Sequence, residues 1–208
     1  MPLPPATIRS RLPPSAEEVY HMAMPIRVDD VTTIEELLAL PDDGLRHELL
    51  DGVHVVTPAP ALPHQAVLLR FIRALDHALL GCDLLALLPS PADIRLGPRT
   101  LVQPDLFAFR KESGRRVREW SEVGVPVLAI EFLSPSTAAR DRGAKRRIYQ
   151  RAGVAEYWIV DLDARLVERW LPEDVRPEIL DERLLWAPPE LSTLLTLDLP
   201  ALFAEALE

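Results

Sequence analysis

The sequence predicts a protein of the α/β class, in which helices pack on a sheet. Three observations favour this class: short apolar runs rich in β-branched residues, two longer segments with apolar residues at helical spacing, and the alternation of these segments along the chain. A chain of 208 residues with 48% hydrophobic content can bury a sizeable core. We expect a single domain at residues 29–208, preceded by a loosely ordered, proline-containing arm at residues 1–28.

The first half of the domain is predicted to hold a short helix, a hairpin and a long helix. Residues 32–36 resemble an N-cap followed by acids in a first helical turn, and Pro41 closes that helix. Residues 48–57 are predicted to form a hairpin, because Asp51-Gly52 is a turn signal between strand formers. The long helix begins at Pro63, which suits a first helical turn, and its apolar spacing continues to Gly81.

The second half is predicted to consist mainly of strands, with one further long helix. That helix spans residues 138–152 and ends at Gly153. Beyond Pro172, repeated prolines divide the chain into short pieces, with a last helical turn at residues 200–207. The strands are predicted near residues 84–88, 92–96, 101–109, 125–133, 157–161 and 166–171.

Charge and cysteine content limit the classes of function. A net charge of −9 argues against a protein whose whole surface binds nucleic acid, but residues 140–151 hold six basic residues and one acid. The single cysteine, Cys82, excludes an internal disulfide framework and favours the reducing cytoplasm. No apolar stretch approaches the roughly 20 residues of a membrane span, so we expect no membrane partner.

Two carboxylates stand inside apolar runs that are predicted to be buried strands, Asp105 and Glu131. If alternation continues through residues 101–109, Gln103 and Asp105 share one side of the strand, and a single pairing register brings Glu131 beside Asp105. Two adjacent carboxylates repel unless a cation or a proton lies between them, and such oxygen ligands suit Mg²⁺ or Mn²⁺. The alternative is that each acid meets an arginine in an ion pair.

A lysine on the second long helix completes this pattern. Of the 23 basic residues only Lys111 and Lys145 are lysines. A lysine in this chain can therefore mark a position whose function an arginine could not perform. Lysine can share a proton with an attacking water, whereas arginine stays protonated. Lys145 lies one helical turn from Tyr149, at the edge of the buried stripe, from where its amine can reach the sheet. Chance placement of one lysine is the alternative.

These residues resemble the PD-(D/E)XK nuclease superfamily, and the wider pattern resembles its Uma-two family. The resemblance runs from about Val31 to Trp170. The segments that carry it are Arg46-His47-Glu48-Leu49-Leu50-Asp51-Gly52, Pro63-His64-Gln65, Val102-Gln103-Pro104-Asp105-Leu106, Glu131-Phe132-Leu133-Ser134-Pro135-Ser136-Thr137, Asp141-Arg142-Gly143-Ala144-Lys145, Tyr149 and Ala152-Gly153-Val154-Ala155-Glu156-Tyr157-Trp158-Ile159-Val160-Asp161.

The resemblance implies a restriction-endonuclease-like mixed β-sheet flanked by helices, and metal-dependent hydrolysis of phosphodiester bonds in DNA. Asp105 and Glu131 match the metal-ligand acids, Glu48 matches an additional upstream acid, and Lys145 matches the lysine. In the superfamily that lysine normally follows the second acid by two residues, where this chain has Leu133. The catalytic lysine is therefore expected to act from the following helix.

Further residues are predicted to support the site. The backbone carbonyl of Phe132 is a further candidate ligand of Mg²⁺ or Mn²⁺. His64 either contacts phosphate or acts as a structural hydrogen-bonding residue. The remaining predicted phosphate-contacting or supporting residues are Gln103, Arg140, Arg142, Arg146 and Tyr149.

Two hypotheses of different class follow. The first is a metal-dependent DNA endonuclease with an Asp/Glu/Lys site. The second is a catalytically inactive protein of the same fold that binds nucleic acid or a protein partner through the helix at residues 140–151. A structural or toxin-like interaction role is a third, more distant hypothesis. Exposed edge strands and the proline-rich C-terminal segment also favour a homodimer.

Overall fold

The computed structural model describes residues 31–192 and 194–208. The predicted arm at residues 1–28 lies outside these residues, as does the predicted start of the domain at residue 29. None of the helices within the described ranges is long and apolar enough to cross a membrane.

A six-stranded mixed sheet forms the centre of the fold. Its only parallel neighbours among the described strands are β7 and β8, and the other neighbours run antiparallel. Parallel neighbours require a long crossover, and a helical segment supplies it here. In spatial order the strands are β10 (Glu178–Leu180), β9 (Leu166–Trp170), β8 (Glu156–Asp161), β7 (Leu128–Phe132), β6 (Leu106–Arg110) and β3 (Leu85–Pro89).

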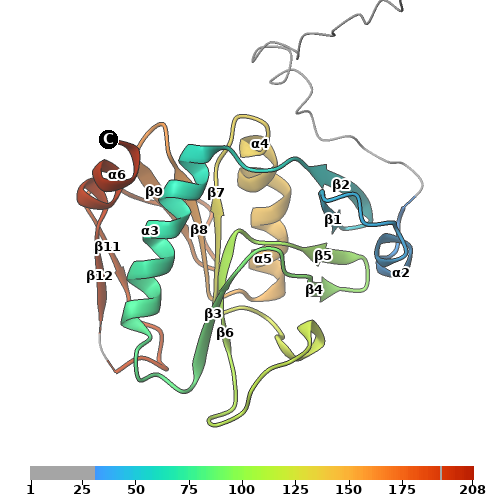
Figure 1. Ribbon diagram of the computed structural model, residues 1–208, viewed down its shortest axis with the longest axis horizontal. Helices are drawn as coiled ribbons and strands as arrows, with labels where there is room; N and C mark the ends of the chain where they lie inside the picture. Colours follow the sequence, from blue (N-terminus) through green and yellow to red (C-terminus); the bar gives the residue numbers. More distant parts are fainter. Residues whose placement is uncertain (1–30, 193) are drawn as a thin grey trace, which may run out of the picture.

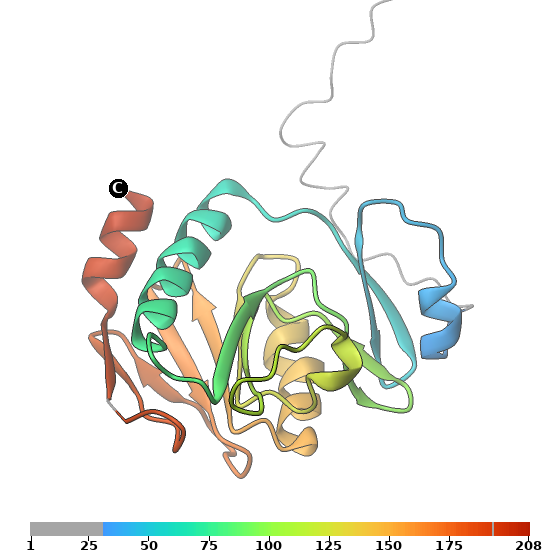
Figure 2. The ribbon, with the colours of Figure 1, turned by 60° about the horizontal axis from the view of Figure 1, so that its bottom comes forward.

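Helices cover both faces of this sheet, as Figure 1 and Figure 2 show. On one face lie α3 (Leu62–Ala78) and α6 (Leu199–Leu207), with the hairpin of β11 (Arg183–Trp186) and β12 (Leu195–Asp198). On the other lies the crossover, which consists of α4 (Ala138–Arg140), the π-helical turn η2 (Asp141–Lys145) and α5 (Arg146–Ala152). The predicted mixed sheet flanked by helices is confirmed.

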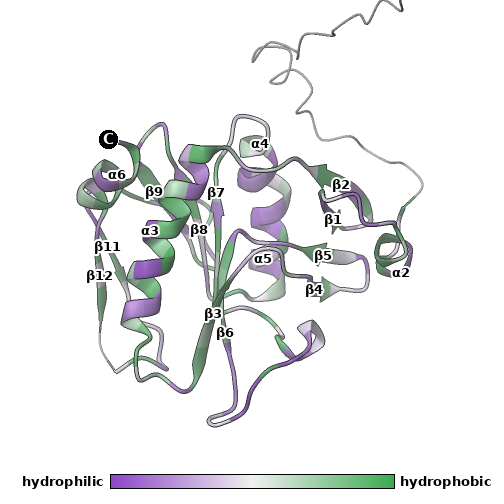
Figure 3. Ribbon diagram, viewed as in Figure 1, coloured by the Kyte–Doolittle hydropathy of each residue, from purple (hydrophilic) through white to green (hydrophobic). Residues whose placement is uncertain are grey.

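Alternation along the central strands separates two hydrophobic cores. Leu106 of β6 and Ile130 of β7 pack with α3, whereas Phe107 and Ala129 pack with α5. Figure 3 shows α3 with both hydrophobic and hydrophilic stretches, as expected of a helix that buries one face. Glu131 lies two residues after Ala129 on β7, so its side chain is on the same face of the sheet and faces α5.

A second, four-stranded sheet lies beside α5, on the right of Figure 1. Its strand order is β2 (Val53–Thr57), β1 (Arg46–Leu50), β5 (Thr100–Val102) and β4 (Ile94–Gly97). The short helix α2 (Ile34–Leu38) packs on β1 and β5. Its N-cap is Thr33, as expected, and Thr33 also forms a capping box with Glu36. A 3₁₀ turn at Trp120–Glu122 (η1) was not expected from the sequence.

The prediction of one continuous strand over residues 101–109 is wrong. The segment divides into β5 and β6, which belong to different sheets, and Gln103-Pro104-Asp105 joins them. Pro104 offers no N–H to a ladder, and the N–H of Gln103 donates to the carboxylate of Glu48 at 2.7 Å. These two residues therefore take no part in a regular ladder, and the chain changes sheets just before Asp105.

The end of α5 generates a stability prediction. Gly153 has a φ of 78°, in the left-handed region, where a side chain costs about 1–2 kcal/mol. Gly153→Ala should therefore lower the free energy of unfolding, measured by urea denaturation, by about 1 kcal/mol or more. The control is Gly143→Ala in η2, since an added Cβ meets open space at both positions but Gly143 lacks a positive φ. Alanine suits that helical position better than glycine, so a loss equal to that of Gly153→Ala would contradict the prediction.

Candidate active site

Asp105 and Glu131 lie at the junction of the two sheets. β6 and β7 pair with Leu106 opposite Ile130, so the next positions along the same register are Asp105 and Glu131. Both side chains are buried, with 4% and 3% of their surface exposed. The backbone N–H of Phe132 donates to Asp105 Oδ2 at 2.9 Å, which fixes that carboxylate against the end of β7. The structure thus brings together the two acids that the sequence singled out.

Asp105 is neutralised by an arginine. Arg46 on β1 donates from Nη1 to Asp105 Oδ1 and from Nη2 to the backbone oxygen of Gln103, both at 2.6 Å. His64, at the start of α3, lies with Nε2 3.2 Å from Asp105 Oδ2. Burial opposes ionisation, but the hydrogen bond from His64 and the charge of Arg46 outweigh it and hold the pKa of Asp105 well below its usual range.

Lys145 holds the other two acids. Its Nζ lies 2.8 Å from Glu48 Oε1 and 2.8 Å from Glu131 Oε1, and only 1% of its surface is exposed. Tyr149, one turn further along, donates its hydroxyl to Glu131 Oε1 at 2.9 Å. Lys145 therefore reaches the sheet from the crossover helix, but it lies between two carboxylates and not in open solvent.

Burial and charge set opposite pKa directions in this cluster. Burial, opposed by Lys145 and reinforced by the charge of Asp105, raises the pKa of Glu131 to about 8. Burial also disfavours ionisation of Glu48, but Lys145 and Arg46 lower its pKa overall. For Lys145, burial disfavours the charged form, yet the charges of Glu131 and Glu48 raise its pKa. The amine is consequently a permanent cation at neutral pH.

Two members of this cluster, Arg46 and Asp141, were assigned no role from the sequence, although both lie within its motif segments. Alternation along β1 could have indicated Arg46, because it lies two residues before Glu48 and so shares its face. Asp141 is buried in the same π-helical turn as Lys145, and burial raises its pKa. Its carboxylate lies 3.9 Å from Arg140 Nε, and its Oδ1 accepts no hydrogen bond within the described residues.

The three arginines predicted to contact phosphate have different surroundings. Arg142 donates to Glu168 and Asp161, and so joins the crossover to β9 and β8. Arg146 lies over the ring of Trp170, with 4.7 Å from its guanidinium carbon to the ring centre.

Arg140 differs from the other two because most of its guanidinium is buried. Its Nη2 donates to Thr57 Oγ1 at 3.0 Å, while Nε and Nη1 are buried with no hydrogen-bond partner within the described residues. These two donors could reach an anion only if the side chain moved. The predicted supporting residue Gln103 donates its side-chain amide to Asp93 and to the backbone oxygen of His47.

An open cleft of about 720 Å³ reaches the cluster from the side of α3. Arg46, His64, Gln103 and Asp105 lie on one part of its lining. The rest is formed by α3, including Leu69, and by the segments before β1, between β2 and α3, and at the end of β3. Glu131 and Lys145 are not part of its lining. Asp105 and Arg46 are therefore the members of the charged cluster that face the cleft.

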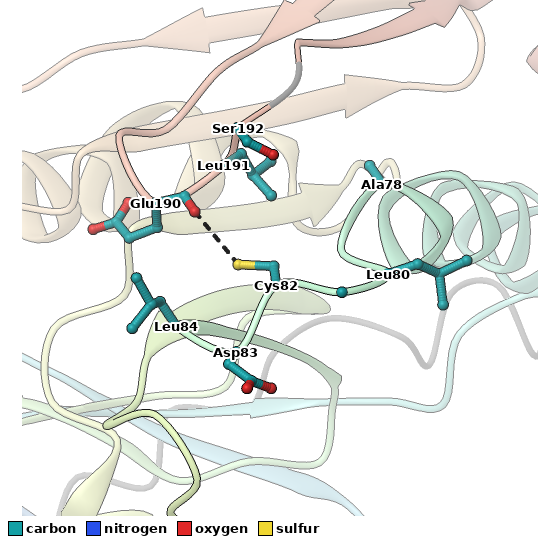
Figure 4. A pocket seen from close by; sticks show the side chains of 9 residues that line it. Ala78, Leu80, Cys82, Asp83, Leu84, Glu190, Leu191 and Ser192 are labelled. Carbon is teal, nitrogen blue, oxygen red and sulfur yellow. Dashed lines mark hydrogen bonds between the residues drawn. The ribbon is translucent and has the colours of Figure 1, made fainter.

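A second hollow of about 220 Å³ lies at the other end of α3 and contains none of these residues (Figure 4). Cys82 Sγ donates there to the backbone oxygen of Glu190 at 3.5 Å. Because this hollow is remote from the acids, it is not part of the candidate site.

The donor chemistry of the site fits a hard divalent cation, although its present arrangement does not form a coordination sphere. Glu48, Asp105 and Glu131 offer carboxylate oxygens only, and Glu48 Oε2 is buried without a hydrogen-bond partner within the described residues. Over residues 31–192 and 194–208, no three His, Cys, Asp or Glu side chains are grouped so as to hold a metal. Arg46 occupies an oxygen of Asp105 instead, as the ion-pair alternative anticipated, whereas Glu131 pairs with Lys145 and not with an arginine.

Comparison with known proteins identifies the family. A family model described as "Uma2: Putative restriction endonuclease" matches residues 34–200. The chain belongs to the Uma2 family. A crystal structure of a putative nuclease belonging to DUF820 from Anabaena variabilis ATCC 29413 has the same fold, with a TM-score of 0.69 and 21% sequence identity. The match covers 84% of this chain and 99% of that one. A search of curated proteins found no match.

Membership of Uma2 confirms the resemblance inferred from the sequence motifs, and the shared fold confirms the predicted fold class. The family description names its members as putative restriction endonucleases.

The raised pKa of Glu131 predicts how stability depends on pH. In the folded protein Glu131 binds its proton with a pKa of about 8, against 4.5 ordinarily. The stabilisation of the folded state by this proton is therefore complete below pH 4.5 and is lost as pH rises through 8. In chelator, the free energy of unfolding should therefore fall between pH 5 and 8.5, by at most about 1.4 kcal/mol per pH unit for this proton.

Glu131→Gln tests this assignment, because it mimics the protonated acid and should flatten the decline in a urea titration. The matched control is Glu112→Gln, which changes a largely exposed side chain beside Arg115 and should retain the wild-type slope. An unchanged slope in Glu131→Gln would assign the decline to other groups.

Proposed function

We propose that this Uma2 protein is a metal-dependent endonuclease that hydrolyses phosphodiester bonds in DNA. The observation that carries the proposal is the convergence of Glu48, Asp105, Glu131 and Lys145 in one buried cluster that meets an open cleft at Asp105. Family membership supports the reaction class. Buried acids from two separate sheets are costly to maintain, which favours a functional reason for their presence.

Mg²⁺ or Mn²⁺ is the cofactor that suits this donor set. Asp105, Glu131 and the backbone carbonyl of Phe132 would hold the ion, with Glu48 as an additional acid. When bound, the ion would polarise a phosphoryl oxygen and lower the pKa of a bound water.

The chain's own residues would then perform three tasks. Lys145 stays protonated, so it holds Glu48 and Glu131 in place and offsets negative charge, and its burial argues against proton abstraction from water. Tyr149 fixes the orientation of Glu131 by its hydrogen bond. His64 lines the cleft with its ring against Asp105 and can donate to a phosphate oxygen there.

A second candidate function rests on a specific observation. Arg46 and Lys145 already neutralise the acids, and such internal ion pairs are what a catalytically inactive member of the fold would retain. That protein would bind nucleic acid or a protein partner through residues 140–151. The homodimer and the cytoplasmic location stay predictions; the edge strands of the central sheet are β3 and β10.

Plasmid cleavage tests the proposed function. Wild type should nick or linearise plasmid DNA in Mg²⁺ or Mn²⁺ and be silent in chelator. Asp105→Asn and Glu131→Gln, which keep side-chain shape but remove ligand charge, should each lower the rate about a hundredfold or more. The control is Asp83→Asn, an exposed acid in the remote hollow, which should retain wild-type cleavage.

The following outcome would contradict the proposed nuclease function. If wild type is silent in both metals and titration calorimetry detects no Mn²⁺ binding, the acids are structural and the binding function replaces the nuclease.

Arg140 gives a separate prediction about DNA binding. Because Arg140 is a cation on the basic crossover segment and two of its buried donors have no partner within the described residues, a bound phosphate could draw its side chain out. Arg140→Ala should therefore weaken binding of a DNA duplex in chelator and reduce the slope of log affinity against log salt by about 1. Fluorescence anisotropy at several salt concentrations measures this slope. Arg165→Ala is the control, since that guanidinium pairs with Glu208. Equal slopes for both variants would exclude Arg140 as a phosphate contact.

A further inference from the structure

Arg46 contacts the oxygens near Asp105 in the way a bound metal ion would. Its two terminal nitrogens reach one carboxylate oxygen and one backbone carbonyl oxygen, each at 2.6 Å, and both oxygens belong to the Gln103-Pro104-Asp105 junction. Carboxylate and carbonyl oxygens are also the ligands that divalent cations prefer. A guanidinium cannot lose its proton in a protein, so its charge stays on this site at every physiological pH.

Arg46 and Lys145 differ in their freedom to move. The side chain of Lys145 is 1% exposed and lies between two acids, whereas that of Arg46 is 18% exposed and lines the cleft. Arg46 Nε is buried with no hydrogen-bond partner within the described residues, so the guanidinium does not use all of its donors in this position. Lys145 is therefore fixed, while Arg46 has an adjacent open space into which it can move.

A divalent cation and Arg46 cannot share Asp105. Two positive groups on one buried carboxylate repel strongly where the effective dielectric constant is low. Asp105 Oδ2 is already engaged by Phe132 N and His64, so Oδ1 is the oxygen for which the two cations compete.

We propose that Arg46 is a built-in competitor of the divalent cation, which neutralises Asp105 in the metal-free protein and moves into the cleft when the ion binds. The inference rests on the metal dependence in the proposed function. It explains how three carboxylates remain together without a metal, and it makes metal affinity depend on a residue that is not a ligand.

Titration calorimetry with Mn²⁺ tests the competition. Arg46→Gln removes the charge and should bind Mn²⁺ about tenfold or more tightly than wild type. Arg46→Lys keeps the charge but cannot span both oxygens, so its gain should be smaller. Arg169→Gln is the matched control: that arginine pairs with Glu178 at the far edge of the sheet and should leave affinity unchanged. Unchanged or weaker Mn²⁺ binding by Arg46→Gln would overturn the inference.

A second measurement uses wild type alone and so avoids any folding defect of a variant. Phenylglyoxal modification, followed by mass spectrometry, should label Arg46 faster when Mn²⁺ is present, and no change in its labelling would contradict the displacement. Cleavage of plasmid with no affinity gain in Arg46→Gln would reject the competitor but leave the nuclease function intact. Absence of Mn²⁺ binding in every variant would reject both.

Discussion

The contact of Lys145 with Glu48 and Glu131 is the interaction on which the rest of the structure depends. Glu48 belongs to the four-stranded sheet, Glu131 to the six-stranded sheet, and Lys145 to the helix between them. One ammonium group thus joins three parts of the fold at a point from which water is excluded. Removal of one partner from such a buried pair typically costs about 3–5 kcal/mol, because the other charge is left uncompensated.

The topology explains why the lysine comes from a helix. β7 and β8 are parallel, so the chain must cross over the sheet between them, and the crossover packs against the face that carries Glu131. In the superfamily the lysine normally follows the second acid by two residues. In this chain that position, just after β7, is Leu133, which packs at the edge of the core on the α5 side. Lys145, in the π-helical turn of the crossover, places an ammonium group against Glu131 instead.

Local patterns were sufficient to predict most of the fold. The apolar runs of β7 and β8, the N-cap at Thr33 and the glycine stop at Gly153 are properties of neighbouring residues, and each appears in the structure. Two carboxylates inside apolar runs and one of only two lysines pointed to Asp105, Glu131 and Lys145, and the family motifs added Glu48. The change of sheet at residues 103–105 was missed because period-2 alternation cannot tell one long strand from two strands in different sheets. The pairing of Asp105 with Arg46 was missed because their side chains are 59 positions apart and meet only after both sheets have formed.

The π-helical turn at Asp141–Lys145 has a consequence for chain length. A π turn accommodates one more residue than an α turn, and each residue of an α-helix turns the chain by about 100°. Deletion of a single residue ahead of Lys145 would therefore rotate α5 relative to α4 by about 100°. Lys145 could then not face Glu131 while Arg140 kept its contact with Thr57. Substitutions of individual side chains would leave this helical phase intact. A change of one residue in the length of the turn would destroy it.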